Sequence, residues 1–169
     1  VVITNAANSY NGYQCFDVVY DNSGRAVVVY ADWQISQQYV YSTLKYTCNV
    51  NLNSYIWNGV AWTSKSIGSF TPYSQSMTKT YDCWVTAAAD PTSNEIMAAH
   101  QDAYGIRVGI WNGASWSSYS VPTSVKYPSV RVVDVGYDSI SGNGMIVWGD
   151  NSYNPKYAVW NGVSWSNIA

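Results

Sequence analysis

The stretch Ile56-Trp57-Asn58-Gly59-Val60-Ala61-Trp62 decides the fold, because the chain contains it three times. It returns as Ile110-Trp111-Asn112-Gly113-Ala114-Ser115-Trp116 and again as Val159-Trp160-Asn161-Gly162-Val163-Ser164-Trp165. The asparagines at positions 58, 112 and 161 are 54 and 49 residues apart. A W-N-G-x-x-W pattern that recurs with a period near 50 indicates a repeat protein, in which each repeat is one supersecondary unit.

Each copy of this motif predicts a tight β-hairpin, since Asn-Gly is the strongest signal for a two-residue type I′ turn. With Asn58 and Gly59 as the turn, we expect Trp57 to pair with Val60, and Tyr55 with Trp62. Side chains alternate between the faces of a strand, so both tryptophans of a copy share one face. We expect them to pack between neighbouring units; the alternative is that at least one tryptophan is exposed and stacks on a sugar. The predicted packing residues are Trp57, Asn58, Gly59, Trp62, Trp111, Asn112, Gly113, Trp116, Trp160, Asn161, Gly162 and Trp165.

A second hairpin precedes each copy of the motif. Residues 16–21, 84–90 and 133–138 each read as a strand that enters a polar turn and continues into another strand. Each unit therefore holds four short antiparallel strands, and no segment shows a helical period. The first unit also carries an insertion around residues 34–53. This pattern predicts an all-β fold of three four-stranded, propeller-blade-like repeats.

The organisation we predict is a single β-repeat domain over residues 1–169. Its units cover about 14–66, 82–121 and 130–169, and residues 1–13 contribute a strand that completes a blade. The ends suggest how this happens. If one chain's C-terminus preceded another's N-terminus, the spacing from Asn161 to the turn aspartate Asp21 would be 29, between the internal values of 26 and 32. We expect the terminal strands to be exchanged between subunits through Val1, Val2, Ile3, Trp165 and Ile168; a fragment of a longer array is the alternative.

The W-N-G-x-x-W hairpin after a Tyr-Asp turn such as Tyr20-Asp21-Asn22-Ser23-Gly24 resembles repeats of large bacterial and archaeal surface proteins. The resemblance covers about residues 15–169 and implies blade-like repeats and an extracellular location. The hairpin also occupies the place of the sialidase Asp box, S-x-D-x-G-x-x-W. The chain lacks the Ser-x-Asp part and the arginine cluster of that family, so sialidase activity does not carry over.

Composition narrows the function classes. Only 11% of the residues are charged and the net charge is −2, so we expect neither a nucleic-acid footprint nor membrane insertion. The chain has 16 Tyr and 9 Trp, residues with a large apolar face and a polar tip that suit interfaces. Three cysteines predict one disulfide and one spare thiol, with Cys48 bridged to Cys15 or Cys83 near the starts of first strands. Three reduced, buried thiols are the alternative.

Candidate catalytic groups are few. His100 is the one histidine, and we interpret it as structural. The candidates for paired carboxylates in glycoside hydrolysis are the aspartates near the starts of first strands, Asp17, Asp82 and Asp134, because first strands converge near a propeller axis. The turn aspartates Asp21, Asp90 and Asp138 do not follow EF-hand spacing, so we expect turn capping rather than calcium binding.

The sequence thus predicts a non-catalytic structural or adhesion protein of the cell surface that self-associates head-to-tail into a ring or filament. We expect it to use no cofactor and no metal. The alternative is a lectin-like module that binds cell-surface glycans through exposed aromatic residues. The two hypotheses differ in whether those aromatic residues meet a second copy or a sugar.

Overall fold

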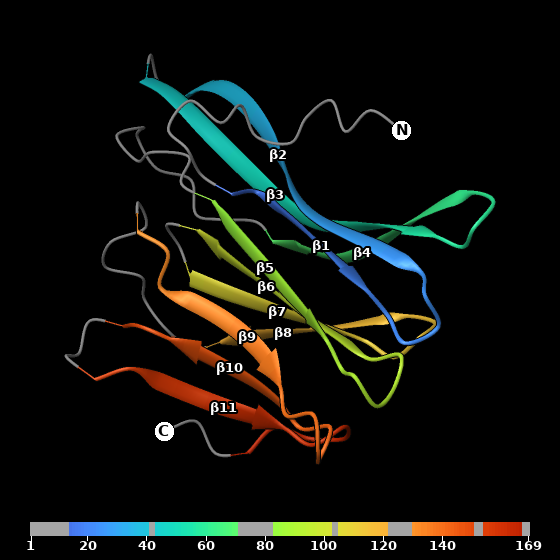
Figure 1. Cartoon of the computed structure of the whole chain (residues 1–169). Helices are drawn as coiled ribbons and strands as arrows, with labels where there is room; N and C mark the ends of the chain where they lie inside the picture. The colour runs from blue at the N-terminus through green and yellow to red at the C-terminus, as the bar shows by residue number, and fades with distance from the viewer. Residues whose placement is uncertain are drawn as a thin grey trace.

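The computed structural model describes residues 14–40, 43–70, 83–102, 105–121, 130–150 and 154–166, with the backbone alone for 33–49 and 70. Within these residues the all-β prediction is confirmed, because every element is a strand and none is a helix (Figure 1). The described part of the chain accordingly contains no apolar helix of membrane-spanning length. The strands are β1 (Phe16–Tyr20), β2 (Ala26–Val40), β3 (Thr43–Trp57), β4 (Trp62–Phe70), β5 (Trp84–Ala89), β6 (Ile96–Asp102), β7 (Gly105–Trp111), β8 (Trp116–Val121), β9 (Val133–Tyr137), β10 (Gly144–Trp148) and β11 (Lys156–Trp160).

The strands form three antiparallel sheets, one for each repeat. Sheet 1 has the order β1-β2-β3-β4, sheet 2 has β5-β6-β7-β8, and sheet 3 has β9-β10-β11. In each sheet, neighbours in the chain are neighbours in space, as expected when short turns connect antiparallel strands. The predicted four strands are therefore present in the first two units, whereas the described part of the third unit has three.

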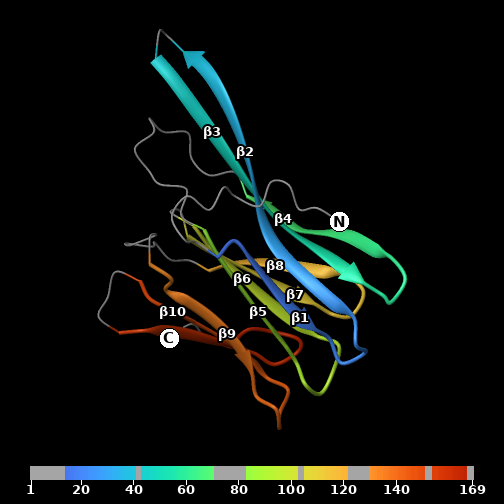
Figure 2. The same cartoon turned by 45° about the horizontal axis from the view of Figure 1, so that its top comes forward.

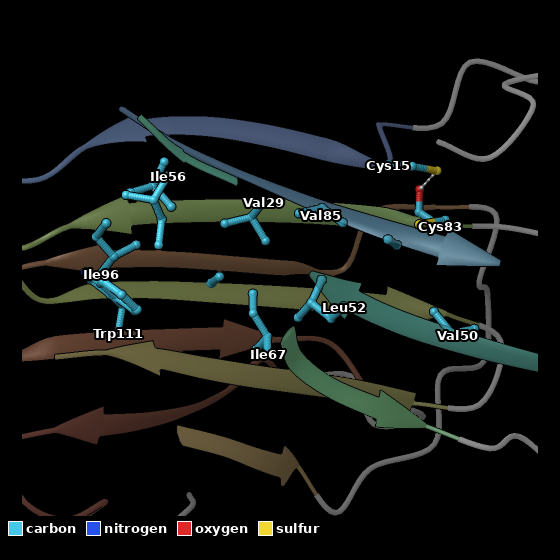
Figure 3. Packing of buried hydrophobic residues seen from close by; sticks show 13 residues of the cluster. Cys15, Val29, Val50, Leu52, Ile56, Ile67, Cys83, Val85, Ile96 and Trp111 are labelled. Carbon is cyan, nitrogen blue, oxygen red and sulfur yellow. Dashed lines mark hydrogen bonds between the residues drawn. The ribbon is translucent and has the colours of Figure 1, made fainter. Parts of the chain in front are cut away.

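The sheets stack face to face in chain order, and the stack does not close on itself (Figures 1 and 2). The first strands lie side by side, with β5 between β1 and β9. One core fills the space between sheets 1 and 2, and includes Val29, Leu52 and Trp111 (Figure 3). A second core fills the space between sheets 2 and 3, and includes Met97, Ile146 and Trp160.

Burial along the strands follows from this stacking. Outer sheets alternate, because one face meets a neighbour and the other does not: β10 runs buried, exposed, buried, exposed, buried. Sheet 2 is covered on both faces, and every residue of β6 is buried. Small apolar residues such as Ala98 and Ala99 in β6 fit this position between two layers.

Polar contacts also join sheets 1 and 2 near their first strands. The Val85 amide donates to the Gln14 carbonyl at 2.8 Å. The Ala87 amide donates to Oδ2 of Asp17 at 2.9 Å. These bonds supply acceptors for amides of β5 that point away from its own sheet.

The insertion in the first unit forms a long two-stranded ribbon rather than a loop (Figure 2). Strands β2 and β3 each contain 15 residues and remain paired from Ala26 opposite Trp57 to Val40 opposite Thr43. The extra residues therefore lengthen two strands of sheet 1 beyond the stack.

Candidate functional site

The Asn-Gly hairpins form as predicted, but their register differs. Trp57 pairs with Trp62 rather than Val60, and Tyr55 pairs with Ser64 rather than Trp62. The connection therefore contains four residues, from Asn58 to Ala61. The Asn58 side chain accepts hydrogen bonds from the amides of Val60 and Ala61, at 3.0 and 2.9 Å. This local bonding satisfies the turn inside the longer connection and corrects the two-residue prediction.

The other two hairpins repeat this geometry. Trp111 pairs with Trp116, and Trp160 forms an isolated bridge with Trp165. The glycines that follow the asparagines, Gly59, Gly113 and Gly162, have φ angles of 94°, 92° and 87°. In all three units the two tryptophan rings lie on one face, with centroids 5.4–5.5 Å apart.

The tryptophan pairs define the direction of the stack. We call the face of each sheet that carries its tryptophan pair the tryptophan face, and the other side the opposite face. The tryptophan face of sheet 2 packs on the opposite face of sheet 1, where the Trp116 indole donates to the Ser54 hydroxyl at 2.9 Å. The tryptophan face of sheet 3 packs on the opposite face of sheet 2, where Tyr119 contacts Trp160 and Trp165.

The tryptophan face of sheet 1 has no neighbouring sheet among the described residues. Phe16 and Tyr20 in β1 are 53% and 66% exposed. Tyr30 stacks on Tyr55 with the ring planes 8° apart, and Trp62 is exposed. The described part of this face is thus an aromatic surface, which is uncommon on a monomeric soluble domain unless it binds something.

The opposite face of sheet 3 is likewise uncovered by any described residue. Met145 and Tyr157 are 43% and 46% exposed, and Val147 lies beside them. A depression of 590 Å³ lies at the end of this face next to the β9–β10 turn. Its lining includes Asp138, Asn143 and Met145.

The three turn aspartates share one hydrogen-bonding pattern, in which the carboxylate accepts from residues of its own turn. Asp21 accepts from the Ser23 amide and hydroxyl and from Arg25. Burial raises the pKa of Asp21, but the hydrogen bonds from the Ser23 hydroxyl and Arg25 outweigh it, so the pKa is lowered overall. Asp90 accepts from Thr92 and Ser93 in the same way. Asp138 accepts from the residues of its own turn as well. The capping interpretation is confirmed for all three.

The other polar candidates are held in structural contacts. Asp17 binds the Ala87 amide, Asp134 contacts Arg131 at 2.6 Å, and Asp82 lies outside the described residues. His100 is fully buried, and Nδ1 is 3.9 Å from Oδ2 of Asp102. Burial lowers the pKa of His100; the charge of Asp102 opposes this shift and the charge of Arg107 adds to it, so the neutral ring is favoured near pH 7. In the described ranges, no three His, Cys, Asp or Glu side chains gather as metal ligands.

The predicted Cys48 bridge is not seen. Neither Cys15 nor Cys83 is part of a disulfide in the structure, and the side chain of Cys48 lies outside what is described. Cys15 instead approaches Cys83, with its Sγ 3.6 Å from the Cys83 carbonyl oxygen (Figure 3).

Of the predicted assembly strands, Val1, Val2, Ile3 and Ile168 lie outside the described residues. At the outer edge of sheet 3, the Ser166 amide donates to the Val159 carbonyl at 2.7 Å beside the Trp165 bridge. A fourth strand therefore begins at this edge, although it is not an element of the described sheet.

Sequence reasoning missed the exposed ends of the stack. The alternation in residues 16–20 and 145–147 marks one apolar face in each strand, but the same signal occurs in strands that are covered. The residues it missed are Phe16, Val18, Tyr20, Met145, Val147 and Tyr157.

No protein-family model, no curated protein and no solved structure matches the chain.

Proposed function

We propose that this protein is a non-catalytic structural protein that associates head-to-tail with copies of itself. The tryptophan face of sheet 1 in one copy would pack on the opposite face of sheet 3 in the next. Both contacts inside the stack are of this type, a tryptophan face on an opposite face. The two faces left uncovered in the described chain are one of each kind, so they are complementary in type.

The observation that carries the proposal is the binding position of Tyr137 between sheets 2 and 3, which we call its seat and which is formed by Asp90, Glu95 and Met97. The Tyr137 hydroxyl donates to Oε1 of Glu95 at 2.9 Å. Burial, with the charges of Glu95 and Asp90, raises the pKa of Tyr137 well above its usual range. The methyl carbon of Met97 lies close to the same site, because a Cβ placed on Gly144 would meet both Met97 and the Tyr137 ring.

The depression at the end of sheet 3 is the equivalent seat without a tyrosine. The turns align residue by residue, so Asp138, Asn143 and Met145 occupy the places of Asp90, Glu95 and Met97. All three line the 590 Å³ depression. A tyrosine that entered it would find a carboxylate, a polar side chain and a methionine, as Tyr137 does.

The tyrosine equivalent to Tyr137 is Tyr20, at the other end of the stack. Each is the last residue of its first strand and directly precedes the turn aspartate. Tyr20 is 66% exposed, a high value for a residue whose counterpart is seated between two sheets. We infer that Tyr20 of one copy enters the Asp138–Asn143–Met145 seat of the next.

Repetition of this contact gives a ring if the rotation closes and a filament if it does not. Two copies that closed would make a six-bladed propeller-like ring. Exchange of the terminal strands, with Val1–Val2–Ile3 of one copy completing sheet 3 of another, would fit the fourth strand that begins at Trp165. We place this assembly outside the cell, at its surface, with an adhesive role. The low charge of the chain and the resemblance of its repeats to those of large surface proteins support this placement.

The test is the mass of the purified protein over a range of concentrations, measured by light scattering, with negative-stain microscopy of the largest species. We expect wild-type mass to rise with concentration and Tyr20→Ala to remain monomeric. Tyr20→Phe removes one hydrogen bond, worth about 0.5–1.5 kcal/mol, so we expect roughly 2–10-fold weaker association. The control is Val163→Ala, because Val163 is exposed in a hairpin loop away from both faces. A monomeric wild type at every concentration, or an associating Tyr20→Ala, would contradict the proposal.

A glycan-binding function is the second candidate, and the stacked Tyr30–Tyr55 pair beside exposed Trp62 favours it. Flat aromatic faces with polar tips suit a sugar ring, which is apolar on one side and carries hydroxyls at its edge. A glycan array probed with monomeric Tyr20→Ala separates the two functions. Binding that Trp62→Ala abolishes would support a lectin, and an array without binding would leave self-association as the role of this face.

A further inference from the structure

Two cysteines from different sheets meet between sheets 1 and 2. Cys15 directly precedes β1, and Cys83 directly precedes β5. They are 4% and 0% exposed, and the Cys15 Sγ lies 3.6 Å from the Cys83 carbonyl oxygen (Figure 3). The backbone holds them there, because the Cys15 carbonyl accepts from the Ala31 amide at 3.0 Å and the Gln14 carbonyl accepts from Val85.

Their approach depends on a one-residue offset between the repeats. Cys15 is six residues before its turn aspartate, Asp21, whereas Cys83 is seven residues before Asp90. Side chains alternate along an extended chain, so the offset places the two cysteines on opposite kinds of face. Cys15 points from sheet 1 toward sheet 2, and Cys83 points from sheet 2 toward sheet 1. Cysteines at equivalent positions would point in the same direction along the stack and would not meet.

The thiol chemistry agrees with the geometry. A side-chain hydrogen bond from Cys83 lowers the pKa of Cys15, and burial opposes this shift. A thiolate is the nucleophile in thiol–disulfide exchange, so the lowered pKa of Cys15 agrees with a reactive pair of thiols at this contact.

We propose that Cys15 and Cys83 form an intramolecular disulfide that joins sheet 1 to sheet 2, in place of the bridge to Cys48 expected from the sequence. The oxidant is a small disulfide such as oxidised glutathione. The Cys15 thiolate attacks one of its sulfurs, a mixed disulfide forms, and one glutathione leaves as a thiolate. The Cys83 thiolate then attacks the Cys15 sulfur and the second glutathione leaves. Two protein thiols lose two electrons in total, their protons pass to solvent, and one disulfide is reduced to two thiols.

Burial sets when the bridge forms and how it behaves afterwards. A reagent does not reach thiols this deeply buried in the closed stack, so exchange takes place while sheets 1 and 2 are assembling. Once formed, the bridge is shielded from reductants until the sheets separate. It adds a covalent cross-link between the first strands of two repeats, which also contact each other through hydrogen bonds.

The experiment is refolding of the full chain from denaturant in a glutathione redox buffer, followed by acid quench, alkylation under denaturing conditions and peptide mapping by mass spectrometry. We expect two of the three cysteines to become protected from alkylation, and a linked peptide pair that contains Cys15 and Cys83. Cys48→Ser should form the same bridge and leave no alkylatable thiol, whereas Cys15→Ser should leave no intramolecular bridge.

Two outcomes would overturn the assignment. One is a linked pair that includes Cys48, and the other is alkylation of all three cysteines in refolded wild type and Cys48→Ser alike. Because a variant that replaces a buried cysteine can fail to fold, the wild-type map decides by itself. The bridge lies within one copy, so a chain that never self-associates would still form it, and the two proposals fail separately.

Discussion

Gly109 in β7 is the position where one added carbon atom most directly tests the stacking of sheets 1 and 2. A Cβ there would lie 2.4 Å from the Ile67 Cγ2 atom and 3.1 Å from Trp116 Cε3. Ile67 is buried in sheet 1, and the Trp116 indole is tied to Ser54 across the same contact. Neither side chain can move away without disturbing the packing, and such overpacking costs about 1–3 kcal/mol.

The matched control is Gly136 in β9, where a Cβ would meet no heavy atom within 4 Å. In the interior of a strand, replacing Gly by Ala stabilises by roughly 0.5–1 kcal/mol through the backbone. This gain applies to both variants and cancels in their comparison. We therefore expect Gly109→Ala to be about 1–3 kcal/mol less stable than Gly136→Ala.

The assay is urea unfolding followed by tryptophan fluorescence, in samples dilute enough to have the monomer mass by light scattering. Thermal unfolding should give the same order, with a separation of roughly 2–4 °C per kcal/mol for a chain of this size. Equal stability of the two variants, or a more stable Gly109→Ala, would refute the described packing of Ile67 and Trp116.

Three further predictions concern single contacts. The pKa of His100 is lowered below 6.5 in the folded chain, so the unfolded chain binds the extra proton as the pH falls. The contribution of His100 to the free energy of unfolding should therefore be fully present above about pH 6.5 and fall by up to about 1.4 kcal/mol per pH unit below it. Urea titrations at pH 7 and pH 5 should show a smaller difference for His100→Gln than for wild type. Asp21→Ala removes the acceptor for Ser23 and Arg25, and we expect the free energy of unfolding to fall by about 1–3 kcal/mol in the same titration at pH 7. An unchanged free energy of unfolding would show that the turn does not depend on this carboxylate. Trp116→Phe replaces the indole by a smaller ring and removes the N–H that donates to the Ser54 hydroxyl, so we expect a loss of about 1 kcal/mol from the hydrogen bond in addition to the loss of packing. A double-mutant cycle with Ser54→Ala isolates the hydrogen-bond part, and a coupling energy near zero would contradict the bond.

The repeat motif was sufficient to predict the sheets. Trp57-Asn58-Gly59 and its copies indicated hairpins, and alternation placed both tryptophans of a pair on one face. The register was wrong because the Asn58 side chain bonds two amides of a four-residue connection, which a rule for two-residue turns does not include. The insertion became paired strands because β2 and β3 simply continue past the stack.

The exposed faces and the cysteine contact could not be predicted in the same way. Alternation in β1 and in β5 looks alike, and only the position of each sheet in the stack decides that Val18 is exposed while Val85 is buried. The pairing of Cys15 with Cys83 depends on a one-residue offset between repeats whose effect appears only when the sheets are stacked.

The most direct test of head-to-tail association is a mixing experiment with two variants. Tyr20→Glu places a charge on the tryptophan face of sheet 1, and Tyr157→Glu places one on the opposite face of sheet 3, with Val163→Glu as the control for an added exposed charge. Each of the first two variants alone should have the monomer mass by sedimentation, because one half of every contact is blocked. Their equimolar mixture should form a dimer and nothing larger, since each supplies the face that the other lacks. A mixture that stays monomeric while wild type associates would contradict a head-to-tail contact between these two faces.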